Sequence, residues 1–396
     1  MIERLTGTIQ PYAWGSHSFL ADLLGTEPTG GPQAELWLGA HHSMPSTVGS
    51  RSLADLVETD PQAVVGPAAV AAFGPKLPYL LKVLAAEQPL SLQAHPSRAQ
   101  AEAGYAREQR SGPAIDSDSR IFKDDWPKPE MLCALIQTEA LCGFRDPEET
   151  YSLFAQLGAG RALKLVAPLA DPELEPSRRL STVFAALLQL PEAEHAVVAE
   201  VVEAAAGLSG GDGELGRWAG LATVLGGHFP GDPSVLAALM LNQLELSPGD
   251  AVYLPAGNLH AYLRGAGIEI MANSDNVLRG GLTAKHIDVN ELLGILDFTP
   301  RPPELVRPVE DAPGLWHYPT PAPEFALWRV EVDGESIELP ESGSGRILLV
   351  VAGEVVIRAG GAAIDLGKGQ SAFASAAETV LLEGTGTAFL AAPGVG

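Results

Sequence analysis

Basic residues are scarce in this chain. Lysine and arginine together number 25, against 49 aspartates and glutamates, so the formal net charge is −24 at pH 7. Binding to nucleic acids and to anionic membranes depends on positively charged surfaces. We therefore expect neither nucleic acid nor a membrane as a partner. In so acidic a protein, a lysine or arginine beside a polar motif is informative, because a small anionic substrate requires positive charge at its binding site.

Cysteines and long apolar runs are also rare. Cys133 and Cys142 are too few for a disulfide framework and belong to no zinc-type pair. No run approaches the roughly 18 apolar residues of a membrane span. Residues 1–16 carry charges near their start in place of the apolar core of a signal peptide. We therefore expect a cytoplasmic protein, and the hydrophobic fraction of 46% is large enough for a folded core.

The hydrophobic pattern changes along the chain. Residues 1–145 and 241–299 contain short apolar runs divided by glycine and proline, which is typical of strands. Between them, residues 146–240 place apolar side chains at helical spacing. We expect a mainly β fold in which the two flanking ranges form a catalytic β domain and 146–240 form an inserted helical domain. Residues 300–396 return to strands and are expected to form a C-terminal β domain without a metal site.

Shorter helices are predicted within the strand-rich regions. Residues 52–65 have helical spacing with Ser52 as the N-cap, and residues 97–112 have helical composition. Another helix is expected from Asp288. The helices expected over residues 97–112 and from Asp288 lie next to polar motifs in the sequence.

The stretch PGDAVYLPAGNLHAYL, residues 248–263, combines a strand with a tight turn. Pro255 and Gly257 would turn the chain after a strand at 251–254, and His260 would open the next strand. This spacing resembles the second signature of the cupin barrel, in which the histidine is a metal ligand. The alternative is an ordinary hairpin that carries a histidine by chance.

Two other segments offer donors for a metal. In SLQAHPS, Gln93 and His95 are two residues apart and share one face of a strand, and in PKPEMLCAL, Glu130 begins an apolar strand. Taken singly, each is more simply explained as a polar residue at a strand end. Together with His260 they provide two imidazoles, a carboxylate and an amide oxygen. That set suits Zn²⁺ with a position open to water or substrate, and Fe²⁺ or Mn²⁺ would be tolerated.

Residues 265–292, GAGIEIMANSDNVLRGGLTAKHIDVNEL, are dense in polar side chains. A solvated loop followed by a helix is the simpler explanation, but loops beside a rigid β scaffold are also typical places for sites. Arg279 and Lys285 would bring two positive charges close to the proposed metal. The polar residues of this segment include Glu269, Asn273, Ser274, Asp275, Asn276, Arg279, Lys285 and His286.

These motifs occur together in one known family. SLQAHPS, KPEM, LCGFR, LPAGNLHAYL and GIEIMANSDNVLRGGLTAKHID, with PYAWGS and AELWLGAHHSMPS before them, resemble in order the signature blocks of the type I mannose-6-phosphate isomerases, or phosphomannose isomerases. The resemblance is detailed over residues 11–288 and looser in the C-terminal region. It implies two cupin-like (jelly-roll) β-barrels with an inserted α-helical module, and one Zn²⁺ per chain.

The resemblance also implies an activity and the residues that serve it. Gln93, His95, Glu130 and His260 match the family's zinc ligands, and Arg279 matches its active-site arginine. The family interconverts mannose 6-phosphate and fructose 6-phosphate. The reaction moves a proton between C1 and C2 through a cis-enediolate, which a metal can stabilise as a Lewis acid.

The proton carrier and the substrate contacts are less constrained. Glu269, Asp275 and Lys128 remain alternatives for the general base and acid. The family often has Asn-His directly before KPE, whereas Trp126-Pro127 precedes Lys128 here, so a histidine in that slot is missing. Lys285, with Ser91 and Arg98, is expected to hold the phosphate. The residues expected to form the pocket wall are Trp14, Glu35 and Tyr262.

Two other functions fit parts of the pattern. Another metal-dependent cupin enzyme, such as an oxygenase or an epimerase, would more typically show a His-x-His pair in place of Gln93 and His95. A non-catalytic sugar-phosphate-binding cupin would be expected to have lost a ligand, and all four are present. We favour the isomerase, whose partner is a small sugar phosphate. The resemblance favours a monomer.

Overall fold

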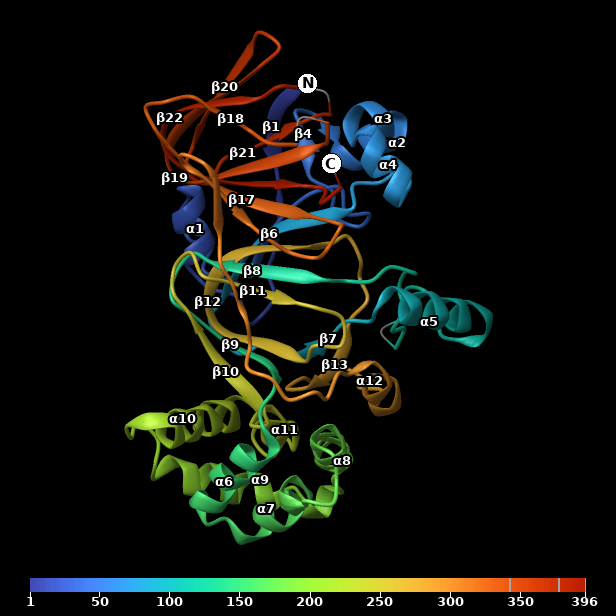
Figure 1. Cartoon of the computed structure of the whole chain (residues 1–396), viewed down its shortest axis with the longest axis vertical. Coiled ribbons are helices and arrows are strands. Elements are labelled where there is room, and N and C mark those ends of the chain that lie inside the picture. Colours follow the sequence, from blue (N-terminus) through green and yellow to red (C-terminus); the bar gives the residue numbers. More distant parts are fainter. Residues whose placement is uncertain (118, 342, 377, 396) are drawn as a thin grey trace.

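The computed structural model of this chain describes residues 1–117, 119–341, 343–376 and 378–395. The strands form two antiparallel sheets, and a group of helices lies at the far side of the first sheet from the second (Figure 1). The strands of the first sheet are β2 (Thr8–Gln10), β3 (Glu35–Leu38), β6 (Tyr79–Ala86), β7 (Leu92–Ala94), β8 (Glu130–Ala134), β9 (Thr138–Phe144), β10 (Leu241–Leu246), β11 (Ala251–Leu254), β12 (His260–Ala272), β13 (Leu278–Gly281) and β14 (Leu305–Val306).

The second sheet is built mainly from the C-terminal part of the chain. Its strands are β1 (Ile2–Thr6), β4 (Thr47–Val48), β5 (Arg51–Ser52), β15 (Val309–Ala312), β16 (Leu315–Tyr318), β17 (Ala326–Asp333), β18 (Ile337–Glu338), β19 (Arg346–Ala359), β20 (Ala362–Gly367), β21 (Ser371–Ala374) and β22 (Leu381–Ala392).

Helices occur in two settings. Those among the strands are α1 (Phe19–Leu24), α2 (Leu53–Thr59), α3 (Pro61–Val64), α4 (Pro67–Phe73), α5 (Arg98–Ser111) and α12 (Val289–Ile295). The group between β9 and β10 is α6 (Pro147–Leu157), α7 (Gly160–Leu165), α8 (Pro176–Leu188), α9 (Ala196–Ala206), α10 (Gly213–His228) and α11 (Ser234–Ala238), with the short 3₁₀ turns η1 (Ala167–Ala170) and η2 (Glu192–Glu194).

The strands of the first sheet turn alternate side chains to two environments. On β6, Leu81 and Val83 pack into a hydrophobic core shared with the second sheet. The Tyr79 hydroxyl donates to the carbonyl oxygen of Ala391 in β22 (3.0 Å), which fastens the two sheets together. Lys82 has the opposite parity and lies on the other face, which we call the inner face. The inner face carries the polar residues of the candidate site.

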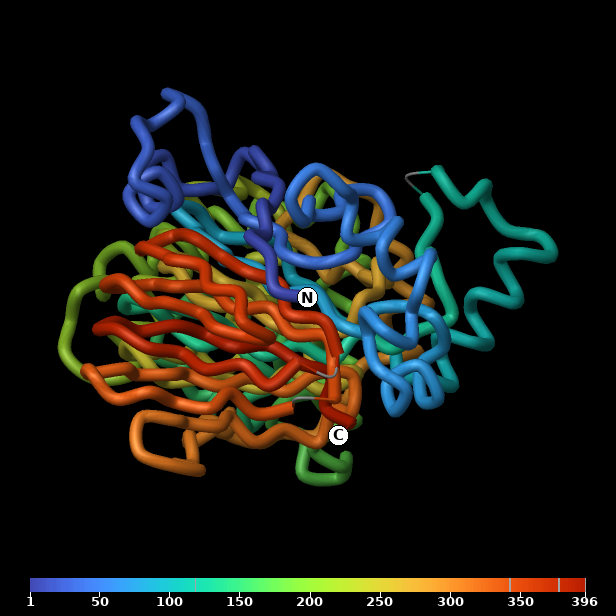
Figure 2. The backbone as a smooth tube through the Cα atoms, turned by 90° about the horizontal axis from the view of Figure 1, so that it is seen from above, coloured from blue at the N-terminus to red at the C-terminus, as the bar shows by residue number. Residues whose placement is uncertain are grey.

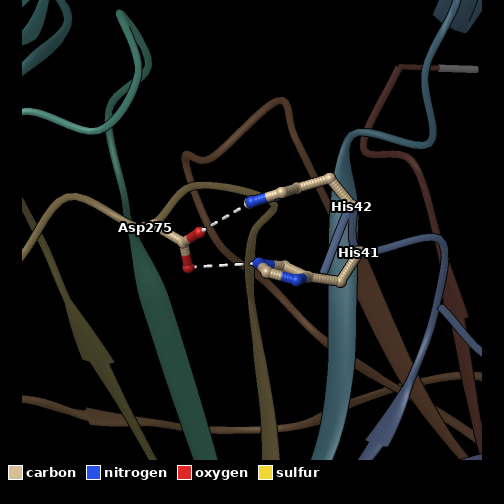
Figure 3. Close-up of side chains that lie close together, drawn as sticks. All are labelled: His41, His42 and Asp275. Carbon is tan, nitrogen blue, oxygen red and sulfur yellow. Dashed lines mark hydrogen bonds and ion pairs between the residues drawn. The ribbon is translucent and has the colours of Figure 1, made fainter. Parts of the chain in front are cut away.

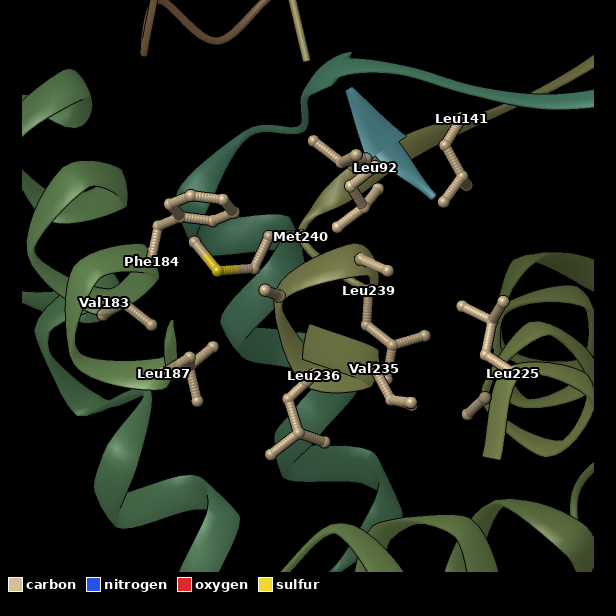
Figure 4. Packing of buried hydrophobic residues seen from close by; sticks show 14 of the residues in the cluster. Leu92, Leu141, Val183, Phe184, Leu187, Leu225, Val235, Leu236, Leu239 and Met240 are labelled. Carbon is tan, nitrogen blue, oxygen red and sulfur yellow. The ribbon is translucent and has the colours of Figure 1, made fainter. Parts of the chain in front are cut away.

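A second core joins the group of helices to the same sheet. Leu92 of β7 and Leu141 of β9 are buried together with Phe184 of α8 and with Met240 (Figure 4). Because neighbouring residues of a strand point to opposite faces, Gln93 projects away from the helices. The apolar partners that hold β7 in place therefore leave its polar side chain on the inner face.

The expected mainly β fold with an inserted group of helices is confirmed, because α6 to α11 lie between β9 and β10. The helix predicted over residues 97–112 is α5, whose N-cap Ser97 accepts from the backbone in a capping box. The helix expected from Asp288 is α12, and the Asp288 side chain caps it. Within the described residues, none of the helices is both long and apolar enough to span a bilayer.

The single helix predicted over residues 52–65 is wrong. Ser52 caps α2 as expected, but the chain turns at Asp60 and a separate helix, α3, begins at Pro61. Asp60 accepts a hydrogen bond from Ala63 N and so caps the second helix. Proline interrupts a helix but suits its first position, which explains the division.

The two sheets do not follow the residue ranges expected for the β domains. β1, β4 and β5 come from the first range but belong to the second sheet, and β14 lies beyond residue 300 but pairs with β11 of the first. In β1, Leu5 lies opposite Ser371 of β21, so the N-terminal strand runs beside the C-terminal ones (Figure 2). The Met1 ammonium donates to Ser375 Oγ (2.8 Å) and pairs with Glu378. Periodicity identifies strands but not their partners, which explains the difference.

Candidate metal centre and active site

Three buried side chains from separate segments meet on the inner face of the first sheet. Oε2 of Glu130, at the start of β8, lies 3.3 Å from His95 Nε2 and 3.4 Å from His260 Nε2. Each of the three residues is buried. Ligand atoms placed about 2.0–2.2 Å from a tetrahedral ion are separated from one another by about 3.3 Å. The cluster therefore has the size that a single metal ion requires.

Both imidazoles are held in the orientation that a metal ligand needs. His95 Nδ1–H donates to the carbonyl oxygen of Asn276 (2.7 Å), and His260 Nδ1–H donates to that of Asn258 (3.0 Å). In the neutral ring, Nε2 then carries the lone pair that faces Glu130. Within the described residues, His95 Nε2 is buried without a hydrogen-bond partner. Burial lowers the pKa of His95, which favours the neutral, metal-binding form.

The turn predicted before His260 brings it to the cluster. Gly257 has a φ of 76°, a conformation that glycine adopts without steric cost. Its N–H donates to the carbonyl oxygen of His95 (2.9 Å), so the turn is fastened to the segment that carries the other histidine. A Cβ at this position would lie 2.7 Å from the carbonyl oxygen of Ile295. The two histidine segments are thus joined at a point where only glycine fits.

Gln93 and Arg279 lie in register with His260. Gln93 on β7 is directly opposite His260 of β12 and Arg279 of β13. Directly opposed residues of antiparallel strands project from the same face. Gln93 Nε2 donates to Ser91 Oγ (3.2 Å), an arrangement that leaves the amide oxygen for other contacts. The amide and the arginine expected in the site therefore share one face with the imidazole.

Lys128 lies beside the cluster and contacts the other oxygen of Glu130. Its Nζ is 3.3 Å from Oε1, and both side chains are buried. Burial by itself raises the pKa of the Glu130 carboxyl, but the neighbouring His95, the Lys128 ammonium and His260 outweigh it. They hold the pKa well below its usual range, so Glu130 is a carboxylate and able to bind a cation.

A second group of buried charges lies on the same inner face. Lys82 Nζ is 3.1 Å from Glu269 Oε2 and 3.8 Å from Glu35 Oε1. Burial lowers the pKa of Lys82, but the two carboxylates outweigh it and raise the pKa above its ordinary value. Burial also raises the pKa of Glu269. Tyr262 is buried nearby, and burial, followed by the charge of Glu269, raises the pKa of its phenol.

Lys82 is a site residue that the sequence analysis missed. It is the single charge in YLLKVLAA, and a lysine in so apolar a strand requires a buried partner, so a signal was present. Its partners come from strands that are remote in sequence: Glu269 of β12 lies directly opposite Lys82, and Glu35 is carried by β3. That pairing is visible only in the fold.

Asp275 lies with two histidines that the sequence analysis did not single out. Its Oδ1 is 3.1 Å from His41 Nε2 and its Oδ2 is 3.7 Å from His42 Nε2 (Figure 3). Burial raises the pKa of Asp275, but the hydrogen bond and charge of His41 outweigh it and lower the pKa to about 2. Asp275 was one of three candidates for the proton carrier, and the structure places it in this separate group.

The remaining expected residues range from buried to exposed. Trp126, which precedes Pro127, the position where the family often has a histidine, is buried, with Lys76 Nζ 3.1 Å and Arg98 Cζ 4.2 Å from its ring centroid. Arg98, a candidate for phosphate binding, is therefore stacked on an indole. Lys285 is exposed in the turn before α12. Trp14 packs against the hydrophobic cluster inside the first sheet.

Comparisons with known proteins agree on one family. The family description "phosphomannose isomerase type I, catalytic domain" matches residues 2–147. The mannose-6-phosphate isomerase of Escherichia coli (strain K12) is 36% identical over 394 residues, which cover 97% of this chain and 98% of the relative. That of Rattus norvegicus is 33% identical over 413 residues, covering 96% and 94%.

Solved structures agree over the whole length. The apo form of mannose 6-phosphate isomerase from Salmonella typhimurium superposes with a TM-score of 0.90 at 36% identity and covers 99% of both chains. A zinc-bound holo form of mannose 6-phosphate isomerase gives a TM-score of 0.89 at 35% identity, again with 99% of both chains covered.

Proposed function

Because the chain belongs to the type I phosphomannose isomerase family, we propose that it interconverts mannose 6-phosphate and fructose 6-phosphate. The observation that carries this proposal is the Glu130 carboxylate, which lies 3.3 and 3.4 Å from two histidine Nε2 atoms. Relatives that match nearly the whole chain bear the name of this isomerase. The reaction is an aldose–ketose isomerisation that moves a proton between C2 and C1 by way of a cis-enediolate.

The residues that would hold a metal are Gln93, His95, Glu130 and His260. Two imidazole nitrogens and a carboxylate oxygen at the observed spacing suit Zn²⁺, and a structural relative is zinc-bound. When bound, zinc supplies Lewis-acid stabilisation of the negative charge that develops on the sugar oxygens. Asn276 and Asn258 hold the two rings so that Nε2 of each faces Glu130 Oε2, where an ion would bind.

We assign the proton transfer to Lys128. Its Nζ is buried 3.3 Å from Glu130 Oε1, which puts an amine directly beside the metal ligands. Removing the proton from C2 of mannose 6-phosphate and returning it to C1, with transfer of the O2 hydroxyl proton to O1, gives fructose 6-phosphate. The other two candidates pair with residues outside the metal cluster, Glu269 with Lys82 and Asp275 with His41, whereas the partner of Lys128 is a proposed metal ligand. Lys128 therefore fits the role best.

The substrate contacts follow from the same face. Arg279, in register with Gln93, would stabilise developing negative charge. Ser91 and Lys285 would hold the phosphate, and the wall of the site would be formed by Trp14, Glu35 and Tyr262. We extend the proposal to a monomeric, cytoplasmic enzyme whose ligands all come from the ranges 1–145 and 241–299. We also propose that residues 300–396 form a C-terminal domain without a metal site.

Metal removal tests the function directly. In a coupled assay of mannose 6-phosphate conversion, protein stripped by a chelator is expected to be inactive, and one equivalent of Zn²⁺ is expected to restore turnover. The reason is that the developing negative charge on the sugar has no comparable stabilisation without the ion. Full activity in thoroughly metal-free protein would contradict the mechanism. Restored zinc binding without turnover would instead favour a sugar-phosphate-binding protein.

Replacement of Lys128 tests its assigned role. We expect Lys128→Ala to lower kcat by about 10²- to 10⁴-fold while the zinc content, measured by elemental analysis, stays at one per chain. Lys128→Arg keeps the positive charge but cannot release a proton at neutral pH, so it is expected to remain equally impaired. Lys368→Ala, which removes an exposed lysine of the second sheet, is the control. Normal turnover in Lys128→Arg would refute proton transfer by this residue.

A further inference from the structure

Outside the Glu130 cluster, a second group of metal-ligating side chains is formed by His41, His42 and Asp275. We propose that these three residues bind a second divalent cation of the zinc class. They share no residue with the first cluster, and they lie in the segment after β3 and in the loop between β12 and β13. Their donor atoms all lie within 4.8 Å of one another.

The spacing of the donor atoms fits one ion. The two nitrogen–oxygen separations, 3.1 Å for His41 and 3.7 Å for His42, bracket the separation of about 3.3 Å expected between ligands of a tetrahedral ion. Each imidazole approaches a different oxygen of Asp275 (Figure 3). A simple hydrogen bond accounts for His41 but not for His42, whose Nε2 lies too far from the carboxylate to donate to it.

The local backbone makes the convergence specific. Consecutive residues of a strand point to opposite faces, but β3 ends at Leu38 and the chain bends, so His41 and His42 both turn toward Asp275. Their rings lie 4.5 Å apart. His41 is buried and packs edge-on against Trp37, with ring centroids 4.7 Å apart. The His41 imidazole is therefore fixed, while the exposed His42 imidazole can rotate to complete the site.

The atom behind the first imidazole also suits a metal ligand. Ser43 Oγ lies 2.9 Å from His41 Nδ1 and can accept from Nδ1–H, a tautomer that leaves the Nε2 lone pair for a cation, whereas the Ser43 backbone N–H donates to Nδ1 (3.3 Å) and favours the other tautomer. Without a cation, the other tautomer lets Nε2–H donate to Asp275 instead. Binding therefore requires a shift of a proton within one ring and a small rotation of His42. Two imidazoles with one carboxylate suit Zn²⁺ or Co²⁺ better than Mg²⁺ or Ca²⁺.

The two sites are joined by a short covalent path. Asp275 is followed directly by Asn276, whose carbonyl oxygen accepts the hydrogen bond from His95 Nδ1 (2.7 Å). The Asn276 side-chain amide donates to the backbone oxygens of Asp124 and Trp126, which holds this loop against the segment leading to Glu130. A cation on Asp275 would thus act on the loop that orients a ligand of the first site.

The test counts zinc ions bound per chain. Protein already loaded with one Zn²⁺ is titrated with Zn²⁺ alone by equilibrium dialysis, and we expect a second, weaker equivalent. His42→Ala is expected to lose that equivalent and to keep the first. His42 is exposed, so its removal does not disturb the core. His228→Ala, which removes an exposed imidazole at the end of α10, is the matched control and is expected to bind as the unmodified chain does.

A second variant and a direct measurement make the result decisive. Asp275→Asn removes the carboxylate charge and is expected to weaken the second equivalent at least about tenfold. Anomalous diffraction at the zinc edge is expected to show a peak between His41, His42 and Asp275 in crystals grown with excess zinc. The proposal is overturned if the unmodified chain binds a single equivalent, if His42→Ala retains the second, or if the second peak lies elsewhere.

Discussion

Glu130→Gln is expected to abolish zinc binding and to lower kcat/KM by about 10³-fold. The substitution preserves the shape of the side chain but removes the negative charge that lies between His95 Nε2 and His260 Nε2. The glutamine amide can also donate an N–H to the Nε2 atoms of the two histidines. These atoms are acceptors because the Nδ1–H groups of the same rings donate to Asn276 and Asn258. In the variant, a hydrogen bond between the amide and a histidine would therefore replace the contacts that the histidines make to a metal ion.

Zinc content per chain and the coupled assay measure the two effects. Glu139→Gln, which changes an exposed glutamate on β9, is the control and should leave both values unchanged. A Glu130→Gln protein that retained one zinc and normal turnover would show that the ion is held elsewhere. Added zinc is not expected to rescue this variant, in contrast to chelated protein.

Lys82→Met is expected to lower the free energy of unfolding by about 3–5 kcal/mol, because removing one partner of a buried ion pair leaves an uncompensated charge. Lys82 stands between Glu269 and Glu35, and each of the three is buried. Methionine fills a similar volume, so the loss isolates the charge from the packing. Urea unfolding at pH 7.5 measures the difference. Lys164→Met, at an exposed position of α7, is the control and should change stability little.

The pH dependence of this loss has a definite sign. Burial raises the pKa of Glu269 even with Lys82 present, and removal of Lys82 raises it further. A carboxyl whose pKa is higher in the folded state contributes stability below its unfolded pKa of about 4.3 and loses that contribution as the pH rises. The deficit of Lys82→Met is therefore expected to shrink between pH 8 and pH 5. Adding Glu269→Gln should recover part of it at pH 8, and an unchanged deficit would contradict the charge argument.

The sequence could predict the metal cluster because its members obey local rules. Gln93 and His95 are two residues apart on one strand, and His260 follows a turn that requires Gly257. Family resemblance then joined these segments to Glu130, and the structure brings His95, Glu130 and His260 within contact distance.

The groups that escaped prediction depend on pairing between strands. Lys82 pairs with Glu269, which lies directly across from it on β12. No local sequence pattern around either residue predicts this pairing. Asp275 was one of three candidates for the proton carrier, yet its side chain pairs with His41 and His42. Periodicity assigns a face to a residue, but the choice of neighbour is made by tertiary packing.

The place of β1 has a consequence for how the protein is made. β1 pairs with β21, which lies more than 360 residues later in the sequence, and Met1 N is bound by Ser375 and Glu378. The second sheet therefore cannot be completed during synthesis until nearly the whole chain has emerged, and its closure has a high contact order. β1 can pair early with β4 on one side, but its other edge has no partner until β21 is available.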